Sequence, residues 1–436
     1  QVYKPGYRPV DCPKVAASCT RSPCLCDDKS KGQAIARKHS EKTWTPEEIH
    51  DAMQQHSLYT WGASGPMLQG ALPVERGDGV YFWTSDGKKY IDFNAQAMCI
   101  HLGHTPDQRI VNAVKEQMET LCYIYPGISS SPIRAKLSAL LAEIVPGDIN
   151  TFMFPSSGAE ANEAAIRIAR KYTGRHKIFA RYRSYHGATL GAGSLTGDFR
   201  RWGLEAGATG VVHCFDPYPY SFSWGDNEEE ITAKCLTALR EQLWYEGPQN
   251  VAAIFLESVT GTNGVLPPPK GYLEGARAMC DKYGILMVCD EVMAGFGRTG
   301  KLFGFCHAPT VVPDIVTFAK GVNGAYIPLG GVGIRDHLAE HFRSNPVGYG
   351  STYNGHPVAL ASAYAALQVL LEDGVIQHVA AMEPIMAKHL ERIAENHPCV
   401  KQARNIGLFG CIDLQVPPAI VMALKMDRYS LSFRTS

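Results

Sequence analysis

The sequence has no surplus of either charge and no long apolar run. Its 42 basic and 42 acidic side chains give a formal net charge of zero at pH 7. Proteins that bind nucleic acid or an acidic membrane surface usually carry an excess of basic residues, and this sequence does not. No apolar run approaches the roughly 18 residues that a helix needs to cross a bilayer. We therefore expect neither nucleic acid nor a membrane among the partners.

The cysteines lack the pattern of a disulfide scaffold or a zinc site. Their number, thirteen, is odd, and most stand singly in apolar segments, as Cys214 and Cys289 do. Buried free thiols in a reducing compartment explain this distribution better than disulfides do. Near the N-terminus, Cys19, Cys24 and Cys26 have no fourth ligand at a usual zinc spacing. The sequence therefore predicts no metal site.

The first 43 residues differ from the rest of the chain. Residues 1–42 contain nine Lys or Arg against four Asp or Glu, and few large apolar side chains. Because this stretch has neither a helical nor a strand period, we expect residues 1–43 to be a disordered extension outside the core. The extension either contains no targeting signal or is the remnant of a mitochondrial or plastid targeting segment. The location is accordingly expected to be cytoplasmic or organellar.

The chain of 436 residues is long enough for large cores, and its overall composition of 45% hydrophobic residues is typical of a globular enzyme. Thr45, Pro46 and Glu48 form a capping box that begins a helix, and Asp86-Gly87 lies between two β-rich runs that predict a hairpin. Strands and helices then alternate. Strands are predicted at 151–154, 178–180, 251–256, 285–289 and 315–319, and helices at 106–121, 160–172, 271–283, 357–373 and 379–396. This order predicts an α/β fold with a mostly parallel sheet between helices.

Chemically useful side chains follow several of these strands. Lys320 comes directly after the apolar run 315–319, Asp290 after 285–289, and Glu257 after 251–256. Ligands of open α/β sheets bind beyond the carboxyl ends of the strands, so these groups should face one crevice. Taken singly, Lys320 could be a surface lysine and Asp290 could cap a helix.

A turn of small residues, Ser157-Gly158-Ala159, precedes the helix predicted at 160–172. Such a turn lets the backbone approach a phosphate, which the free N–H groups at a helix N-terminus can bind. It could equally be a plain tight turn, and the chain lacks the Gly-x-Gly-x-x-Gly dinucleotide fingerprint at this position. Tyr185 follows another strand and either stacks on a planar ligand or packs in the core.

The combination is more specific than any member. A phosphate cradle, a stacking aromatic, an acid for a pyridine nitrogen and a lysine for an aldehyde are the groups that pyridoxal 5′-phosphate (PLP) requires. We therefore interpret Lys320 as the residue that binds PLP covalently.

Five segments carry a resemblance to a known family. They are 157–163 (SGAEANE), 185–187 (YHG), 290–300 (DEVMAGFGRTG), 318–321 (FAKG) and 352–357 (TYNGHP). In order and spacing they resemble the class III (ω-amino acid) aminotransferases of PLP fold type I, from about Trp61 to about Leu414. The segments 181–187 and 195–202 look most like the taurine aminotransferase branch.

The resemblance implies a role for each matching residue. Lys320 would carry PLP and move the proton, and Asp290 would pair with the pyridine nitrogen. Val292 and Tyr185 would lie on the two faces of the ring, and Thr352 would reach the phosphate of a neighbouring subunit, which makes the active unit a homodimer or a dimer of dimers. The remaining expected contacts are Ser157, Gly158 and Ala159 for the phosphate, His186 and Glu257 beside the ring, and Trp61 and Tyr59 in the substrate pocket.

The resemblance also implies domains and exposes departures. It places an N-terminal segment of the small domain at 44–105, the large PLP-binding domain with a sheet of the seven-stranded type at 106–343, and the rest of a smaller α+β domain at 344–436. Met293 stands where many members have a glutamine that bonds the PLP hydroxyl, and Ser258 stands where proline is frequent. After about residue 414 the sequence no longer looks like the family, so we expect an altered or truncated small domain.

The expected activity is transfer of an amino group from an ω-amino acid or terminal amine, such as taurine or β-alanine, to 2-oxoglutarate or pyruvate. Alternatives on the same cofactor are an aminomutase, a racemase or a decarboxylase. A non-catalytic relative or defective fragment is a further alternative. A plain nucleotide-binding α/β protein is disfavoured by the missing glycine fingerprint.

Overall fold

The computed structural model describes residues 29–65, 73–204 and 207–415, which fall into two compact units with the boundary between Pro73 and Val74. The first contains α1 (Lys29–Ser40) and α2 (Pro46–His56). The side chain of Thr45 accepts a hydrogen bond from the Glu48 amide while the Glu48 side chain accepts one from the Thr45 amide. This confirms the predicted capping box and the helix that it begins.

Helix α1 corrects the expectation that residues 1–42 contain no helix. None of its residues is buried. Its sequence contains three lysines and two alanines, which favour a helix, but has no amphipathic period strong enough to reveal it. The predicted disorder of residues 1–28 lies outside the described residues.

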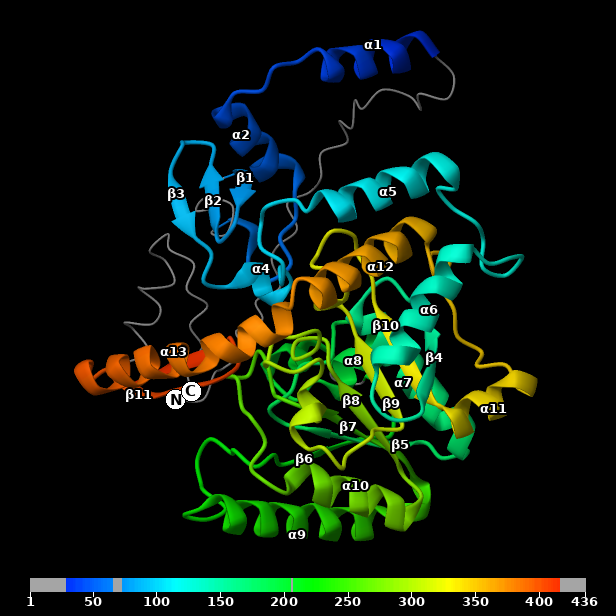
Figure 1. Cartoon of the computed structure of the whole chain (residues 1–436), viewed down its shortest axis with the longest axis vertical. Helices are drawn as coiled ribbons and strands as arrows, with labels where there is room; N and C mark the ends of the chain where they lie inside the picture. Colours follow the sequence, from blue (N-terminus) through cyan, green and yellow to red (C-terminus); the bar gives the residue numbers. More distant parts are fainter. Residues whose placement is uncertain (1–28, 66–72, 205–206, 416–436) are drawn as a thin grey trace, which may run out of the picture. The chain divides into compact units, whose positions relative to one another are not determined.

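The second unit is built on a seven-stranded sheet with the spatial order β4-β10-β9-β8-β7-β5-β6 (Figure 1). The strands are β4 (Ile149–Met153), β5 (Lys177–Arg181), β6 (Val211–Cys214), β7 (Val251–Glu257), β8 (Leu286–Asp290), β9 (Ile315–Phe318) and β10 (Gly331–Arg335). Strands β5 to β9 pair in parallel, whereas β10 runs antiparallel to both β4 and β9. The predicted fold class, a mostly parallel sheet of the seven-stranded type, is confirmed.

Helices cover both faces of this sheet, because each strand places alternate apolar side chains on opposite sides. One hydrophobic cluster joins α6, α9, α10 and α12 to one face, and a second joins α7 and α11 to the other. The helices are α5 (Gln108–Thr120), α6 (Pro132–Ile144), α7 (Gly158–Thr173), α8 (Leu190–Leu195), α9 (Glu228–Glu246), α10 (Tyr272–Tyr283), α11 (Asp336–Ser344), α12 (Pro357–Glu372) and α13 (Val375–Asn396).

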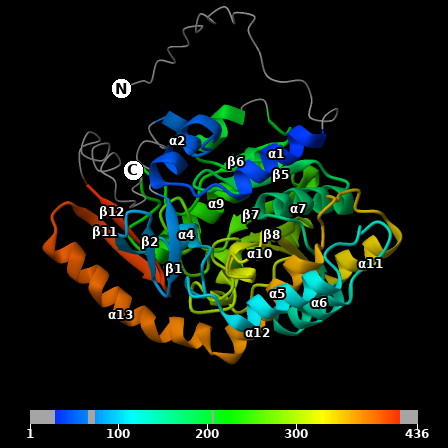
Figure 2. The same ribbon diagram turned by 90° about the horizontal axis from the view of Figure 1, so that it is seen from above.

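Smaller elements surround this layer arrangement. The predicted hairpin is present as β2 (Tyr81–Thr84) and β3 (Lys89–Ile91), and β1 (Val74–Asp78) extends it to three antiparallel strands. The antiparallel pair β11 (Val400–Ile406) and β12 (Phe409–Leu414) lies against α13, as Figure 2 shows. The domain boundaries expected after residues 43, 105 and 343 stay predictions.

Within the described ranges, no single helix is both long enough and apolar enough to span a bilayer. Helices α12 and α13 reach that composition only as a pair, which is bent by 59°.

Arg175 joins the ends of several elements near the amino ends of the strands. Its Nη1 lies 2.8 Å from the carbonyl oxygen of Gly284, 3.2 Å from that of Tyr283 and 3.1 Å from that of Val251. Tyr283 and Gly284 end α10, where carbonyl groups have no partner within the helix. The guanidinium therefore satisfies carbonyl groups that would otherwise be left without a donor.

We predict that Arg175→Met lowers the free energy of unfolding by about 2 kcal/mol, because partly buried carbonyl groups lose a charged donor. Chemical denaturation followed by fluorescence measures this change. Arg167→Met, at an exposed position of α7, makes the same chemical change away from these carbonyl groups and is the matched control. Equal stabilities of the two variants would contradict the assigned role of Arg175.

Glu291 is a second side chain that connects separate parts of the backbone through hydrogen bonds. Its side chain is completely buried, and its carboxyl oxygens accept hydrogen bonds from the amides of Gly304 (2.7 Å) and Phe305 (2.9 Å). Burial raises the pKa of Glu291 to about 7 from its ordinary value of 4.5.

Glu291→Gln should make the unfolding free energy less dependent on pH. Between pH 4.5 and about 7 the folded protein keeps this carboxyl group protonated, whereas the unfolded chain releases the proton. The stability contributed by Glu291 therefore falls as pH rises through this window. Relative to the variant, the wild type should lose up to about 3 kcal/mol across it. Denaturation curves at several pH values test this, and parallel pH profiles would show that Glu291 does not titrate there.

Candidate active site

A cavity of about 430 Å³ opens at the carboxyl ends of the sheet strands in the second unit. It is lined by the turn before α7, by the segment after β5, by the ends of β7 and β8 and by the residues that follow β9. The lining residues are Cys99, Ser156, Ser157, Gly158, Ala159, Tyr185, His186, Gly187, Ala188, Glu257, Asp290, Val292, Met293, Ala319, Lys320, Asn323, Ala325, Ile327, Pro328 and Leu329. The crevice predicted from the strand order is therefore present.

The turn before α7 exposes backbone donors to this cavity. Ser157 is the N-cap of the helix, and its side chain accepts a hydrogen bond from the amide of Glu160. Gly158 and Ala159 are the first helical residues, whose amides have no acceptor within a helix. A Cβ atom on Gly158 would lie 2.8 Å from Cγ2 of Val292, so a larger residue would push against that side chain. The turn therefore has the small residues and free amides of an anion site.

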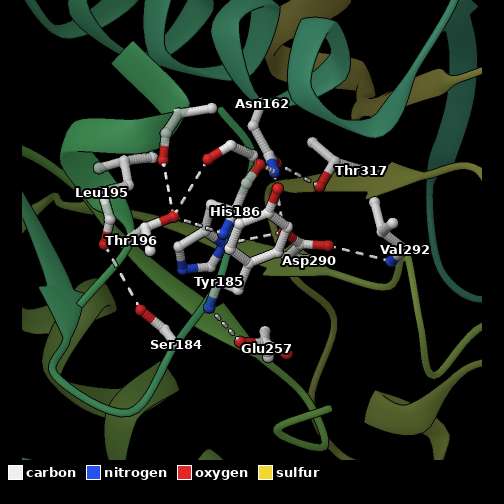
Figure 3. Close-up of polar contacts among 12 residues, drawn as sticks. Asn162, Ser184, Tyr185, His186, Leu195, Thr196, Glu257, Asp290, Val292 and Thr317 are labelled. Atoms are coloured by element: carbon white, nitrogen blue, oxygen red, sulfur yellow. Dashed lines mark hydrogen bonds and ion pairs between the residues drawn. The ribbon is translucent and has the colours of Figure 1, made fainter. Parts of the chain in front are cut away.

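Asp290 ends β8 and is only 3% exposed. Figure 3 shows that donors surround it: Oδ2 accepts hydrogen bonds from Nδ2 of Asn162 and from Nδ1 of His186, each at 2.8 Å, and Oδ1 accepts one from the Val292 amide at 3.0 Å. An ionised carboxylate only accepts hydrogen bonds, so Nδ1 of His186 carries the proton. Among the described residues, no lysine or arginine forms an ion pair with Asp290.

Glu257 and Tyr185 meet on the other side of the cavity. Oε1 of Glu257 accepts a hydrogen bond from the Tyr185 amide at 2.9 Å, and Oε2 accepts one from the Gly261 amide at 2.7 Å. Burial raises the pKa of Glu257. The guanidinium carbon of Arg200 lies 3.7 Å from the centre of the Tyr185 ring, a cation–π distance. The backbone and the ring of Tyr185 are thus held by different partners.

Lys320 begins a short 3₁₀ turn (Lys320–Val322) directly beyond β9. Its φ of +45° lies in the left-handed region, which a residue with a side chain adopts only at a cost of order 1–3 kcal/mol. Such strain is concentrated at functional sites, where the surrounding structure maintains it. Cys99 lines the same cavity, and burial raises the pKa of its thiol.

Most of the predicted cofactor residues are brought together around the cavity. They are Ser157, Gly158, Ala159, Tyr185, His186, Glu257, Asp290, Val292 and Lys320. Thr352 is not among the lining residues; its carbonyl oxygen accepts a hydrogen bond from the Tyr123 hydroxyl at 2.7 Å. Tyr59 and Trp61 belong to the first unit, so their expected place in the substrate pocket stays a prediction.

Sequence reasoning assigned no role to two buried neighbours of Asp290. Asn162 lies within the 157–163 segment, but the pattern of that segment points only to the phosphate turn. Thr317 lies in a strand that reads as continuously apolar and β-branched. Its hydroxyl donates a 2.7 Å hydrogen bond to Oδ1 of Asn162. A polar residue inside an apolar strand was the available signal for Thr317.

Comparison with known proteins identifies the family to which this chain belongs. Residues 64–427 match the family described as Aminotransferase class-III. Putrescine–pyruvate aminotransferase of Pseudomonas aeruginosa is 32% identical over 362 residues, which cover 79% of this chain and 77% of that protein. Gamma-aminobutyrate transaminase 1, mitochondrial, of Oryza sativa subsp. japonica is 34% identical over 83% of this chain and 74% of its own length.

Solved structures are similar over a greater share of the chain. Taurine:2-oxoglutarate aminotransferase from Bifidobacterium kashiwanohense, in complex with PLP and glutamate, is 41% identical with a TM-score of 0.82, covering 88% of this chain and 89% of that chain. An (S)-enantioselective omega-transaminase from Thermomicrobium roseum is 38% identical with the same TM-score, over 87% and 86%. The family resemblance expected from the five segments is confirmed, and this chain belongs to the class III aminotransferases, a family of PLP-dependent transaminases.

Proposed function

We propose that this transaminase takes its amino group from the terminal amine of an ω-amino acid of the taurine or β-alanine class and passes it to 2-oxoglutarate or pyruvate. The observation that carries the proposal is the 41% identity to the taurine:2-oxoglutarate aminotransferase. The donor leaves as an aldehyde and the 2-oxo acid leaves as an amino acid, so the two half-reactions exchange one amino group for one carbonyl oxygen.

The residues around the cavity fit PLP. The amides of Gly158 and Ala159 would hold its phosphate, and Lys320 would bind its aldehyde. Asp290 is a buried carboxylate whose bound donors are an amide, an imidazole and a backbone N–H, so a protonated pyridine nitrogen would supply the cation that it lacks. When bound, PLP supplies the electron sink that makes removal of a proton next to the amine feasible.

The chain's own residues would divide the remaining work. The amine of Lys320 would take the proton from the reacting carbon of the donor and return it to the neighbouring position, as a general base and then a general acid. Tyr185 and Val292 would fix the plane of the ring from its two faces. Glu257, held by the amides of Tyr185 and Gly261, would order the wall beside the ring.

A second copy of the chain would complete the site. Thr352 is exposed, and its neighbour Tyr353 is 62% exposed and makes an edge contact with Tyr123 at 5.8 Å. Ile128, in the loop after Tyr123, is 81% exposed. Exposed apolar side chains of this size are typical of interfaces, so we propose that they pack against a partner subunit that receives Thr352 at its phosphate.

An organellar location is supported by the basic composition of residues 1–43 and by the mitochondrial naming of the rice relative. A cytoplasmic location is the alternative.

The activity is tested by incubating the PLP-loaded protein with taurine, β-alanine, putrescine or γ-aminobutyrate and with either 2-oxo acid. We expect glutamate or alanine to form with taurine or β-alanine. Lys320→Ala should abolish the visible absorption of covalently bound PLP and reduce the rate by at least about a hundredfold. Product formed without any 2-oxo acid would instead indicate a mutase, a racemase or a decarboxylase, and an unchanged spectrum in Lys320→Ala would contradict the assigned lysine.

The shared site is tested at Thr352. Thr352→Ala should weaken PLP binding by about tenfold, because one hydrogen bond to a charged phosphate is lost, while the protein remains dimeric in sedimentation. Thr151→Ala, at an exposed position of β4, is the matched control. A wild type that sediments as a fully active monomer would contradict the proposed role of the partner.

A further inference from the structure

Asn162 contacts Asp290 and Thr317 contacts Asn162, and neither of the two residues lines the cavity. We propose that these two residues form a relay that fixes the Asp290 carboxylate in the orientation required to hold the pyridine nitrogen of PLP. Both are positioning residues that act through Asp290 and do not themselves touch the cofactor. The inference rests on PLP as the cofactor and goes beyond the proposed substrate class.

The contacts of the relay are short and fully buried. Asn162 and Thr317 are each 0% exposed. The Thr317 hydroxyl donates to Oδ1 of Asn162 at 2.7 Å, and Nδ2 of Asn162 donates to Oδ2 of Asp290 at 2.8 Å, as drawn in Figure 3. Nδ2 also donates to the carbonyl oxygen of His186 at 2.7 Å. Both ends of the Asn162 amide are thus used.

These contacts fix which way the Asn162 amide points and give each of its polar atoms a partner. Asp290 and the His186 carbonyl are both acceptors, so the NH₂ end of Asn162 must face them. A rotated amide would place Oδ1 against two other oxygens and leave buried groups unsatisfied. Thr317 completes this orientation, because its hydroxyl donates to Oδ1, which would otherwise be a buried acceptor without a donor.

The relay also connects three elements of the site. Asn162 stands on α7, one turn after Gly158 and Ala159. Thr317 stands on β9, opposite Asp290 in the parallel register of β8 and β9 and three residues before Lys320. Buried hydrogen bonds therefore link α7, β8 and β9, the three elements that carry or precede the residues proposed for the phosphate, the ring nitrogen and the aldehyde.

If the relay acts on the ring nitrogen, disrupting it should weaken the binding of PLP but not of an analogue that lacks this nitrogen. PLP has a pyridine nitrogen for Asp290 to hold, whereas a carbocyclic analogue with CH in place of that nitrogen has none. Thr317→Val keeps the shape of the side chain but removes the hydroxyl, so Oδ1 of Asn162 loses its donor and the amide no longer holds the Asp290 carboxylate in one fixed position. The variant should lose affinity for PLP and keep its affinity for the analogue.

The test measures dissociation constants of the apoprotein for both compounds by equilibrium titration. We expect Thr317→Val to bind PLP about tenfold more weakly than the wild type does, because the hydrogen bond between the Asp290 carboxylate and the ring nitrogen is impaired. We expect the variant and the wild type to bind the analogue equally well, because the analogue has no such nitrogen. Thr317→Ser retains the hydroxyl and should restore PLP binding. Equal weakening of both compounds would mean that Thr317 is merely structural, and that result would overturn the relay.

Two further comparisons keep the test decisive. If Thr317→Val does not fold, Asn162→Asp replaces it, since this change keeps the size of the side chain but replaces the donor by an acceptor; the same selective loss is expected. Thr151→Val at the exposed surface of β4 is the control for the substitution itself. A wild type that fails to bind PLP would contradict the cofactor assignment, whereas a wild type that binds PLP with an unaffected Thr317→Val variant would contradict the relay alone.

Discussion

The site depends on keeping one carboxylate in the interior of the protein. Removing a carboxylate from water costs several kcal/mol unless hydrogen bonds or a cation compensate. At Asp290, three donors compensate part of that cost and leave the negative charge without a lysine or arginine partner in the described part of the chain. This charge would favour a cationic ring in the cavity, because a neutral ligand would leave it uncompensated. Every other element of the site can be understood as placing a group at a fixed distance from this charge.

The sheet accomplishes this placement because β7, β8 and β9 are parallel and in register. Glu257 is paired with Asp290, and Asp290 with Thr317, so residues far apart in sequence reach the same edge at the same level. Helix α7 brings its N-terminus to that edge and packs its other end on the sheet through Ile166 and Ile168. An anion at the helix N-terminus and a cation at Asp290 then have complementary positions, which suits a ligand that carries a phosphate at one end and a protonated nitrogen at the other.

The position of the site at the carboxyl ends of the strands could be predicted from the sequence. Lys320, Asp290 and Glu257 each follow an apolar strand, and the rule that ligands bind beyond the carboxyl ends of strands brings them together without coordinates. The structure bears out the alternation that predicted the sheet and the crevice. The antiparallel strand β10 and the edge strand β6 were not predicted, because short apolar runs with glycine or histidine have no clear period. Asn162 and Thr317 were not assigned either, since an amide on a helix and a hydroxyl in a strand become meaningful only when their partner is known.

The residues proposed to bind PLP and those expected to select the amino donor lie in different parts of the structure. All the groups proposed for PLP lie in the second compact unit, where hydrogen bonds hold Glu257 and Asp290 and the strands that carry them are buried in the core. The groups expected to select the amino donor, Tyr59 and Trp61, lie in the other unit, and Thr352 would come from a second copy. Rigidly placed binding residues suit a cofactor that stays in the site, whereas the two substrates enter and leave the site in turn. A family can therefore keep its cofactor chemistry while changing its donors, because substitutions in the separate unit leave the hydrogen bonds to Asp290 intact. This division explains why similarity identifies the cofactor and the reaction more readily than it identifies the amine.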